Sequence, residues 1–301
     1  MGEKIHYLLH GIQDRYNALY QDNITQLGDQ DIAIASIGGS GQSLLGNILL
    51  ELGLNYADPY IDALSADGTS QPVAAYADYR TRLAATDRTT ADNKDGVQTR
   101  WPRFIKTHLT PEFLAHRNLL GAWILPRDPR DSLYSWHKFR TNFAKDPLDL
   151  RAGTFEEWLD QPGPTGADRL TDWATFYDAW DEARENFRRS TVTTFEELKQ
   201  EPIAALRNGL GDLGIQVGTE DLARAVERSS FANMRAHEEN HPDNKKSEPM
   251  TKTRIMRSGT PNEWHRWITP SLHRKFSSGH IAEVARRFGY QTTQAYPTAA
   301  G

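Results

Sequence analysis

Short apolar runs alternate with helical patterns along most of the chain. Apolar residues fill Ile32–Ile37 and glycines follow them, which predicts a buried strand that ends in a tight turn. From Leu44 to Leu52 the apolar residues recur at helical spacing, and Gly53 is expected to end that helix. Residues 4–27 predict a further helix that precedes this strand–helix unit.

Two more apolar runs, Arg103–His108 and Gly121–Arg127, predict buried strands that each end in a polar or charged residue. Pro129 suits the first turn of the helix expected to follow. The other predicted elements are an aromatic-rich helix around Trp173 and Trp180, a strand at Ser190–Phe195, three helical segments up to about residue 238, and a helical part at about 263–288.

This order of strands and helices predicts the α/β class, with a parallel sheet flanked by helices on both faces. Ligands of such sheets bind at the carboxyl ends of the strands. Gly38–Ser43, His108 and Arg127 all fall at such ends, so we expect them to share one site. Residues 1–301 are expected to form a single domain, with a cap-like insertion at about 55–100 and a mobile lid loop at about 240–256.

Composition then narrows the classes of function. The chain is 38% hydrophobic and 25% charged, as is typical of a soluble globular protein. Its 35 basic and 40 acidic residues give a net charge of −5, which argues against nucleic-acid binding through bulk charge. Without cysteine there is no disulfide, catalytic thiolate or Cys-ligated zinc. The N-terminus lacks a signal-peptide pattern and no run approaches the ~20 apolar residues of a membrane span, so we expect a cytoplasmic protein with no membrane partner.

The Gly/Ser stretch after the first strand has the composition of an anion-binding loop. Glycines let backbone N–H groups approach an anion, the following helix adds its N-terminal partial charge, and Ser40, Gln42 and Ser43 offer side-chain donors. The stretch is not a Walker A motif, because no lysine follows the glycines, and Leu44 stands where a dinucleotide fingerprint has its third glycine. A Gly-rich turn without a ligand is the alternative.

Two other pairs of polar residues suggest chemistry. Lys106 and His108 lie two apart on one strand, so their side chains point to the same face, and a histidine beside an ammonium stays neutral and suits a general base. Arg127 and Ser135 could clamp a phosphate. Taken alone, the first pair also fits a solvated strand end and the second a surface cluster of charges.

Together with three later segments, these motifs resemble the cytosolic-type sulfotransferases that use 3′-phosphoadenosine 5′-phosphosulfate (PAPS). The segments occur in the order of the family's motifs, from about residue 31 to residue 270. Six motifs of the family have counterparts here. GGSGQSL (Gly38–Leu44) corresponds to PKSGTTW, IKTHLT (Ile105–Thr110) to LKTHLP, and RDPRDSLYSWHKF (Arg127–Phe139) to RNPKDVAVSYYHF. FEELKQEP (Phe195–Pro202) corresponds to YEDLKEDP, SSFANM (Ser229–Met234) to TSFxxM, and RSGTPNEWHRWIT (Arg257–Thr269) to RKGxxGDWKxxFT.

The resemblance implies a P-loop-NTPase-like fold and a metal-free enzyme. Such an enzyme moves the sulfonate of PAPS to a hydroxyl, phenol or amine of a small-molecule acceptor and releases 3′,5′-ADP. By resemblance His108 would be the base and Lys106 would lie near the sulfonate. The implied nucleotide-binding residues are Gly39, Ser40, Gly41, Gln42 and Ser43 for the 5′-phosphosulfate, Arg127, Ser135, Arg257, Ser258 and Gly259 for the 3′-phosphate, and Phe195, Ser229 and Phe231 for the adenine.

The chain departs from the family pattern at charged positions. Gly39 stands where the family has its loop lysine, and Ser258 replaces the lysine of the RKG motif. Gly38 replaces the loop proline and Leu44 a tryptophan. Lys106, backbone donors or an arginine would have to supply the missing charge. A PAPS-binding protein with lost or altered catalysis is therefore an alternative to the transferase.

Two further alternatives come from other motifs. The stretch HEENH fits the zinc-hydrolase signature H-E-x-x-H, with His237 and His241 as ligands, Glu238 as base and Glu263 as a possible third ligand. Pro242 and the polar surroundings argue against such a helix. A P-loop kinase using ATP would need the Walker lysine that this chain lacks.

The acceptor pocket is expected between the cap-like insertion and the lid loop. Five aromatic side chains could line it or simply pack beneath the cap: Tyr56, Tyr60, Tyr76, Tyr79 and Trp101. No short dimerisation motif of the family is evident near the C-terminus, so the sequence predicts no particular oligomer.

Overall fold

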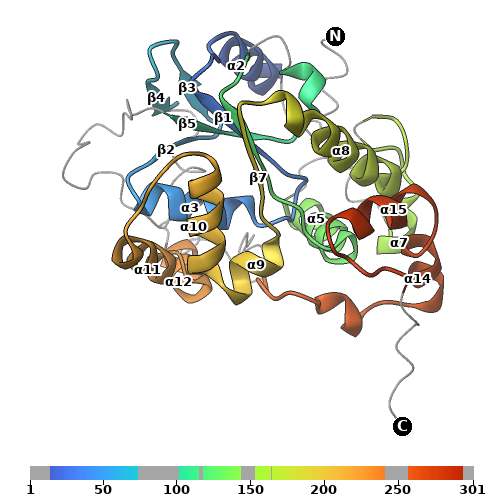
Figure 1. Ribbon diagram of the computed structural model, residues 1–301. Coiled ribbons are helices and arrows are strands. Elements are labelled where there is room, and N and C mark those ends of the chain that lie inside the picture. Colours follow the sequence, from blue (N-terminus) through green and yellow to red (C-terminus); the bar gives the residue numbers. More distant parts are fainter. Residues whose placement is uncertain are drawn as a thin grey trace.

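Among the described residues, five short parallel strands form the central sheet, in the order β2–β5–β1–β6–β7 (Figure 1). The computed structural model describes residues 14–73, 102–114, 118–143, 153–163, 165–240 and 257–293. The strands of the sheet are β1 (Asp31–Ala35), β2 (Asn55–Ala57), β5 (Arg103–Thr107), β6 (Gly121–Ile124) and β7 (Arg189–Val192), and a separate antiparallel pair joins β3 (Asp62–Leu64) to β4 (Ser70–Pro72).

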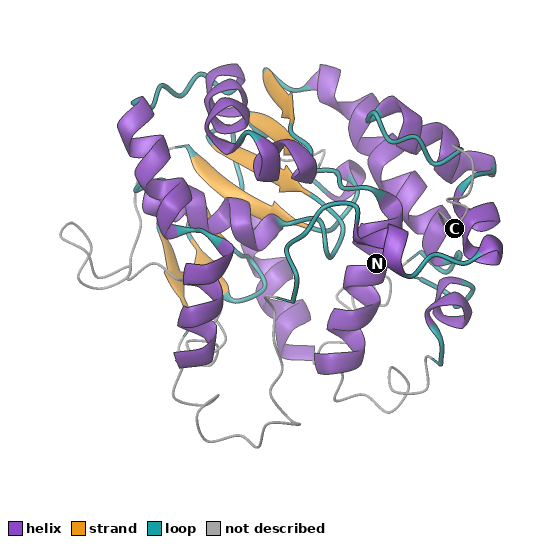
Figure 2. Cartoon of the chain, turned by 90° about the horizontal axis from the view of Figure 1, so that it is seen from below, coloured by secondary structure: helices purple, strands orange, loops and turns teal. Residues whose placement is uncertain are grey.

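Helices cover both sides of the sheet (Figure 2). The longer helices are α2 (Asp14–Thr25), α3 (Gln42–Glu51), α5 (Pro129–Phe143), α8 (Arg169–Ala183), α10 (Pro202–Asp212), α11 (Thr219–Arg228), α12 (Phe231–Asn240) and α15 (Gly279–Arg287). The shorter ones are η2 (Pro111–Phe113), α7 (Phe155–Leu159), η4 (Arg184–Asn186), α9 (Phe195–Gln200), η6 (Glu263–Arg266) and α14 (Pro270–Phe276). Among the described residues, no helix is long and apolar enough to cross a membrane.

Alternate residues of the strands enter two separate cores, which is why the strands read as continuous apolar runs. Ala33 and Ala35 of β1 face a core that includes side chains of α2, α5, α8 and α15. Ile32 and Ile34 face the other core, which α3, α10 and α11 complete. A strand buried on both faces has no polar alternation, and β1 is buried at all five positions.

The register of β1 and β5 aligns their carboxyl ends. Asp31 pairs with Arg103 at the beginning of the two strands, and their fully buried side chains form an ion pair with a Nε–Oδ1 distance of 2.7 Å. At the other end, Ser36 N donates to Thr107 O at 3.3 Å, and Leu125 N donates to Ala35 O at 2.9 Å. The residues that follow β1, β5 and β6 therefore emerge at one edge of the sheet, as the sequence predicts.

The predicted fold class is confirmed, and several element boundaries need correction. The predicted strand at Ser190–Phe195 ends at Val192, and Phe195 is instead the first residue of α9. Four helices rather than three run from there to Asn240. Asn55–Ala57, at the start of the predicted cap-like insertion, forms the edge strand β2 of the main sheet. The rest of that insertion from residue 74 to 100, and the predicted lid loop from 241 to 256, lie outside the described residues.

Candidate functional site

The loop between β1 and α3 requires glycine at two positions. Gly39 has a φ of 84° and Gly41 a φ of 88°, a region that glycine adopts without steric cost. A Cβ on Gly39 would lie 2.5 Å from Ser132 O, in α5, and a Cβ on Gly41 would lie 2.4 Å from the ring of Phe195. This backbone therefore has no room for a side chain at position 39, and a lysine there would require a different arrangement of the loop and α5.

Two of the predicted side-chain donors of this loop are turned into the protein. Ser40 is 1% exposed, and its Oγ lies 3.2 Å from Ser132 Oγ and 3.0 Å from the Tyr177 hydroxyl. Gln42 Nε2 donates to Ile34 O at 2.7 Å. Anion binding by these residues would therefore use backbone N–H groups, and α3 leaves its first N–H groups without intrahelical partners. Ser43, in the first turn of α3, is half-buried.

Arg127 connects three segments that are distant in the sequence. Its Nη1 donates to Gly39 O at 2.8 Å, and its Nη2 donates to Thr260 O at 3.1 Å. Its guanidinium lies 4.3 Å from the centre of the Phe195 ring. The side chain is 5% exposed, and its Nε has no hydrogen-bond partner among the described residues. The predicted 3′-phosphate arginine therefore adjoins the predicted 5′-phosphosulfate loop.

Other predicted nucleotide residues lie around this junction. Ser135 in α5 is adjacent to Gly39, because a Cβ on that glycine would lie 3.0 Å from the Ser135 Cβ. Gly259 has a φ of 60° and packs against Phe231, whose Cδ2 would be 2.7 Å from an added Cβ. Ser229 is fully buried at the end of α11, and its Oγ has no hydrogen-bond partner among the described residues.

Arg257 and Ser258 both bind a carboxylate of the protein. The two Nη groups of Arg257 donate to the two oxygens of Glu263, with an Nη1–Oε1 distance of 2.7 Å. Ser258 Oγ donates to Glu263 Oε2 at 3.1 Å. The backbone of this segment is fixed to α5, since Asp131 accepts hydrogen bonds from Glu263 N at 3.1 Å and Trp264 N at 2.7 Å.

At the end of β5, Lys106 and His108 have separate partners. Lys106 Nζ donates to Asp58 Oδ2 at 2.8 Å, and Asp58 is 3% exposed. His108 Nδ1 lies 2.6 Å from Ser36 O, and the ring of His108 stacks on Tyr60 with centroids 5.9 Å apart. A carbonyl oxygen only accepts, so Nδ1 carries the proton of the neutral ring and Nε2 is its basic nitrogen.

The ionisation of His108 fits its surroundings. Burial, the largest cause, and the Lys106 ammonium together lower the pKa of His108 from 6.5 to about 4, against weaker opposing effects of Ser36 O and Asp58. The imidazole is therefore neutral at pH 7, which is the state that accepts a proton.

A sequence model of the sulfotransferase domain matches residues 29–287, which include every residue of this site. The chain belongs to the sulfotransferase domain family. Mouse sulfotransferase 2A2 is 30% identical over 186 residues, which cover 59% of this chain and 60% of that protein. The matches to mouse and rat sulfotransferase 2A1 cover 60% and 63% of those proteins, so the aligned part of the chain spans less than two thirds of these curated relatives.

Two solved structures have the same fold. The mouse sulfotransferase SULT7A1 complexed with PAP superposes with a TM-score of 0.57 at 17% identity, covering 88% of this chain and 90% of that one. Retinol dehydratase in a complex with retinol and PAP gives a TM-score of 0.58 at 14% identity, covering 91% and 86% of the two chains. At these identities the likeness concerns the fold alone.

Two of the aromatic residues suggested for an acceptor pocket of this sulfotransferase-family chain are buried by packing. Tyr56 packs against Gly46 of α3, since a Cβ on that glycine would lie 2.5 Å from the Tyr56 ring. Tyr60 is 7% exposed and lies between His108 and Tyr20, whose ring centroid is 4.7 Å away. The other three, Tyr76, Tyr79 and Trp101, lie outside the described residues.

The residues of the zinc-hydrolase alternative are only partly described. His237 and Glu238 belong to α12, and His241 lies outside the described residues. Within the described part of the chain, no group of three or more histidines and carboxylates is placed to hold a metal ion.

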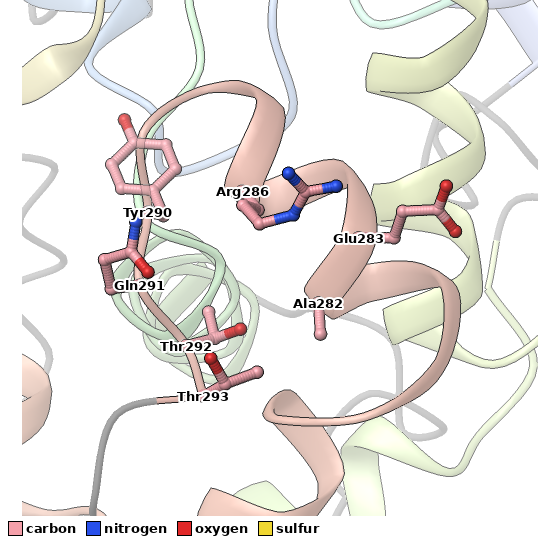
Figure 3. Close-up of a pocket in the computed structure, with 7 residues that line it drawn as sticks. All are labelled: Ala282, Glu283, Arg286, Tyr290, Gln291, Thr292 and Thr293. Carbon is pink, nitrogen blue, oxygen red and sulfur yellow. The ribbon is translucent and has the colours of Figure 1, made fainter.

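A pocket of about 250 Å³ opens elsewhere in this sulfotransferase-family fold, between α15 and the segment after it (Figure 3). None of the predicted site residues lines it. Its lining residues are Ala282, Glu283, Arg286, Tyr290, Gln291, Thr292 and Thr293.

Sequence reasoning missed the carboxylates that pair with Lys106 and Arg257. Asp58 follows a three-residue strand in a polar stretch, and nothing in the pattern connects it to Lys106, 48 positions later. The sequence suggests Glu263 only as a possible metal ligand. Its separation of six residues from Arg257 could have indicated their ion pair, because a short loop that contains a glycine can bring the side chains of Arg257 and Glu263 together.

Proposed function

We propose that this protein is a PAPS-dependent sulfotransferase that moves the sulfonate of PAPS to a hydroxyl or amine of a small-molecule acceptor and releases 3′,5′-ADP. We further propose that it works in the cytoplasm. The PAP bound in the two similar solved structures is 3′,5′-ADP, the nucleotide product of such a transfer. Retinol in one of those structures, and androsterone in a further structure of retinol dehydratase, are small alcohols, which supports a small hydroxyl compound as the acceptor.

The observation that carries the proposal is the position of Arg127. Its guanidinium contacts Gly39 O, Thr260 O and the face of Phe195 at the same time. These contacts join the loop expected to hold the 5′-phosphosulfate, the segment expected to hold the 3′-phosphate and the ring expected to contact the adenine. One nucleotide with two separated phosphate groups requires such a junction.

Unsatisfied donors at the junction also fit a nucleotide. Arg127 Nε, Arg257 Nε and Ser229 Oγ are buried and have no hydrogen-bond partner among the described residues. A buried donor without a partner costs about 1–3 kcal/mol, so a ligand acceptor placed there would recover a favourable interaction. Guanidinium and backbone N–H groups would thus bind the two phosphates, and the Ser229 hydroxyl would be available to the adenine.

In the proposed reaction His108 removes the proton of the acceptor hydroxyl through Nε2 while the acceptor oxygen attacks sulfur. Its Nδ1–H bond to Ser36 O holds the ring in the required tautomer. The pKa of about 4 keeps the ring neutral at physiological pH, although so low a pKa also makes it a weak base. Lys106 would stabilise negative charge on the transferred group, which requires its ammonium to leave or share Asp58.

Incubation of the protein with ³⁵S-labelled PAPS and a library of phenols, alcohols and amines tests the proposal. We expect labelled product from the wild type and a loss of about 10²–10⁴ in rate for His108→Ala, because a positioned base contributes that much. Binding of 3′,5′-ADP should remain in that variant. His280→Ala, at an exposed histidine that pairs with Asp178, is the matched control and should keep both properties.

The same experiment addresses the second candidate, a PAPS-binding protein without transferase activity. The ion pair between Lys106 and Asp58 and the absence of a side chain at Gly39 favour it, because both remove cationic charge from the sulfonate. Tight 3′,5′-ADP binding without labelled product from any acceptor would support this candidate. Wild-type turnover that persists in His108→Ala would remove that residue from its role.

A further inference from the structure

Three donors meet at the carboxylate of Glu263. Arg257 Nη1 donates to Oε1 at 2.7 Å, Arg257 Nη2 donates to Oε2, and Ser258 Oγ also donates to Oε2, at 3.1 Å. Two parallel guanidinium bonds to paired oxygens are the geometry that arginine offers to phosphate as well as to carboxylate. The Glu263 carboxylate therefore occupies an anion-binding position.

Only the side chain of Glu263 takes part in this arrangement. Its backbone N–H is bound to Asp131 Oδ2 at 3.1 Å, and the neighbouring Trp264 N–H is bound to Oδ1 at 2.7 Å. Rotation of the Glu263 side chain would withdraw the carboxylate without breaking these backbone bonds. The Arg257 side chain is 28% exposed and that of Glu263 is 12% exposed, so a ligand can reach the pair from solvent.

Arg127 places this anion position beside the rest of the site. It donates to Thr260 O at 3.1 Å, between Ser258 and Glu263 in the sequence, and to Gly39 O at 2.8 Å. Both residues that bind the Glu263 carboxylate, Arg257 and Ser258, are residues at which the proposed function expects a 3′-phosphate.

The Glu263 carboxylate is charged when it competes with a phosphate for Arg257 and Ser258. Its hydrogen bonds to Arg257 lower the pKa of Glu263, so it is ionised at neutral pH. A phosphate brought to the same donors would meet a like charge at close range, which is unfavourable unless one of the two anions moves away.

We propose that Glu263 is a specificity-determining residue, whose carboxylate stands in for the 3′-phosphate and must be displaced from Arg257 and Ser258 when the nucleotide binds. This inference rests on the proposed PAPS-dependent function. A nucleotide with a 3′-phosphate gains these donors only after Glu263 has moved, whereas a nucleotide without that phosphate leaves the pair intact. Glu263 therefore weakens the binding of 3′-phosphorylated nucleotides in particular, which favours release of the product.

If Glu263 instead only orients Arg257 for the phosphate, its removal has the opposite effect. The guanidinium would then lose its support, and the affinity for 3′-phosphorylated nucleotides would fall. The sign of the change in affinity therefore distinguishes displacement from support.

Titration calorimetry with two nucleotides tests the inference, using 3′,5′-ADP and 5′-AMP, which lacks the 3′-phosphate. We expect Glu263→Gln to bind 3′,5′-ADP about tenfold more tightly than the wild type, and 5′-AMP with unchanged affinity. Asp221→Asn is the matched control, because it also removes one carboxylate from an arginine pair, at Arg224, where both side chains are more than half exposed. It should change neither affinity.

Equal or weaker binding of 3′,5′-ADP by Glu263→Gln would overturn the inference, as would an equal gain for both nucleotides. If the wild type and both variants fail to bind 3′,5′-ADP, both the inference about Glu263 and the proposed function are wrong. Wild-type binding without a gain in the variant rejects only the role of Glu263. If Glu263→Gln does not melt cooperatively, Glu263→Asp replaces it, since a side chain one methylene shorter loses reach and should show a smaller gain in the same direction.

Discussion

Lys106 is held between a carboxylate and the base that it influences. Its ammonium is 2.8 Å from Asp58 Oδ2 and lies 5.6 Å from the centre of the Tyr60 ring, on which His108 stacks. Lys106 and Asp58 act on the pKa of His108 in opposite directions, the lysine lowering it and the carboxylate raising it. Burial lowers the pKa of His108 most, and the two charges of this pair then adjust how readily the ring takes a proton.

We predict that Lys106→Met raises the pKa of His108 by roughly one unit. The substitution removes the ammonium that disfavours the imidazolium and leaves the Asp58 carboxylate to favour it, so both changes act in the same direction. Titration of the histidine ring signals by NMR measures this without any substrate. Lys275→Met, which removes a lysine paired with Asp160 elsewhere, is the control and should leave the His108 titration unchanged. A lower or unchanged pKa in Lys106→Met would contradict the geometry described.

Among the elements, the loop after β1 depends on close contact with α5. Gly38 meets the side chain of Trp136, with 2.9 Å between an added Cβ and Cδ1, and Gly39 meets Ser132 O. These contacts explain why the loop carries glycine where the family has proline and lysine. A side chain at either position would push α5 away from the sheet.

Gly39→Ala should therefore cost more stability than the backbone angle alone explains. Gly166→Ala is the matched control, because Gly166 has a φ of 90° but nothing within 4 Å of an added Cβ. We expect Gly166→Ala to lower the free energy of unfolding by about 1–2 kcal/mol through its left-handed backbone. Gly39→Ala should lower it by a further ~1–3 kcal/mol through overlap with α5. Urea denaturation measures both, and equal losses would mean that α5 yields to the new methyl group.

The sequence predicted those helices and strands whose apolar run or period is long enough to be recognised. β1, β5 and β6 were found within a few residues, and Pro129 and Gly53 correctly marked a helix start and a helix end. The edge strand β2 was missed because three residues carry no periodicity. Phe195 was placed on a strand, because Thr194 reads as part of an extended run although its side chain caps α9 by accepting from Glu197 N.

The cationic side chains of the candidate site could be predicted from the sequence, whereas their carboxylate partners became evident only from the structure. Motifs alone pointed to Arg127, Arg257, Lys106 and His108 as candidates, because these residues occupy matching positions in motifs that resemble those of the family. Their carboxylate partners depend on side-chain directions in three dimensions, and no local pattern encodes the pairing of Lys106 with Asp58. The orientation of the Ser40 side chain into the core also depends on the three-dimensional structure, since its partner Tyr177 belongs to a helix more than 130 residues later.

At the scale of the whole molecule, the core beside α5 contains an ionisable group that burial holds in one state. His137 of α5 is 4% exposed, and its ring lies 5.5 Å from that of Phe155 and 5.4 Å from that of Trp158. Neither ring nitrogen has a hydrogen-bond partner among the described residues. Burial, the larger cause, and the nearby Lys138 together lower the pKa of His137 from 6.5 to about 4. The folded state therefore disfavours a proton that the unfolded chain accepts readily.

This difference makes stability depend on pH in a definite direction. The contribution of neutral His137 is fully present above pH 6.5 and is lost as the pH falls from 6.5 toward 4, because protons then bind the unfolded chain more strongly than the folded protein. His137→Phe removes that term and keeps an aromatic ring beside Trp158. The free energy of unfolding of the variant, relative to that of the wild type, should thus rise by about 3 kcal/mol between pH 7 and pH 4. Urea denaturation of both proteins at several pH values measures the difference between their free energies of unfolding. Titratable groups that are common to both proteins cancel in this difference. Parallel curves for the two proteins over this range would show that His137 takes up its proton without unfolding the core around it.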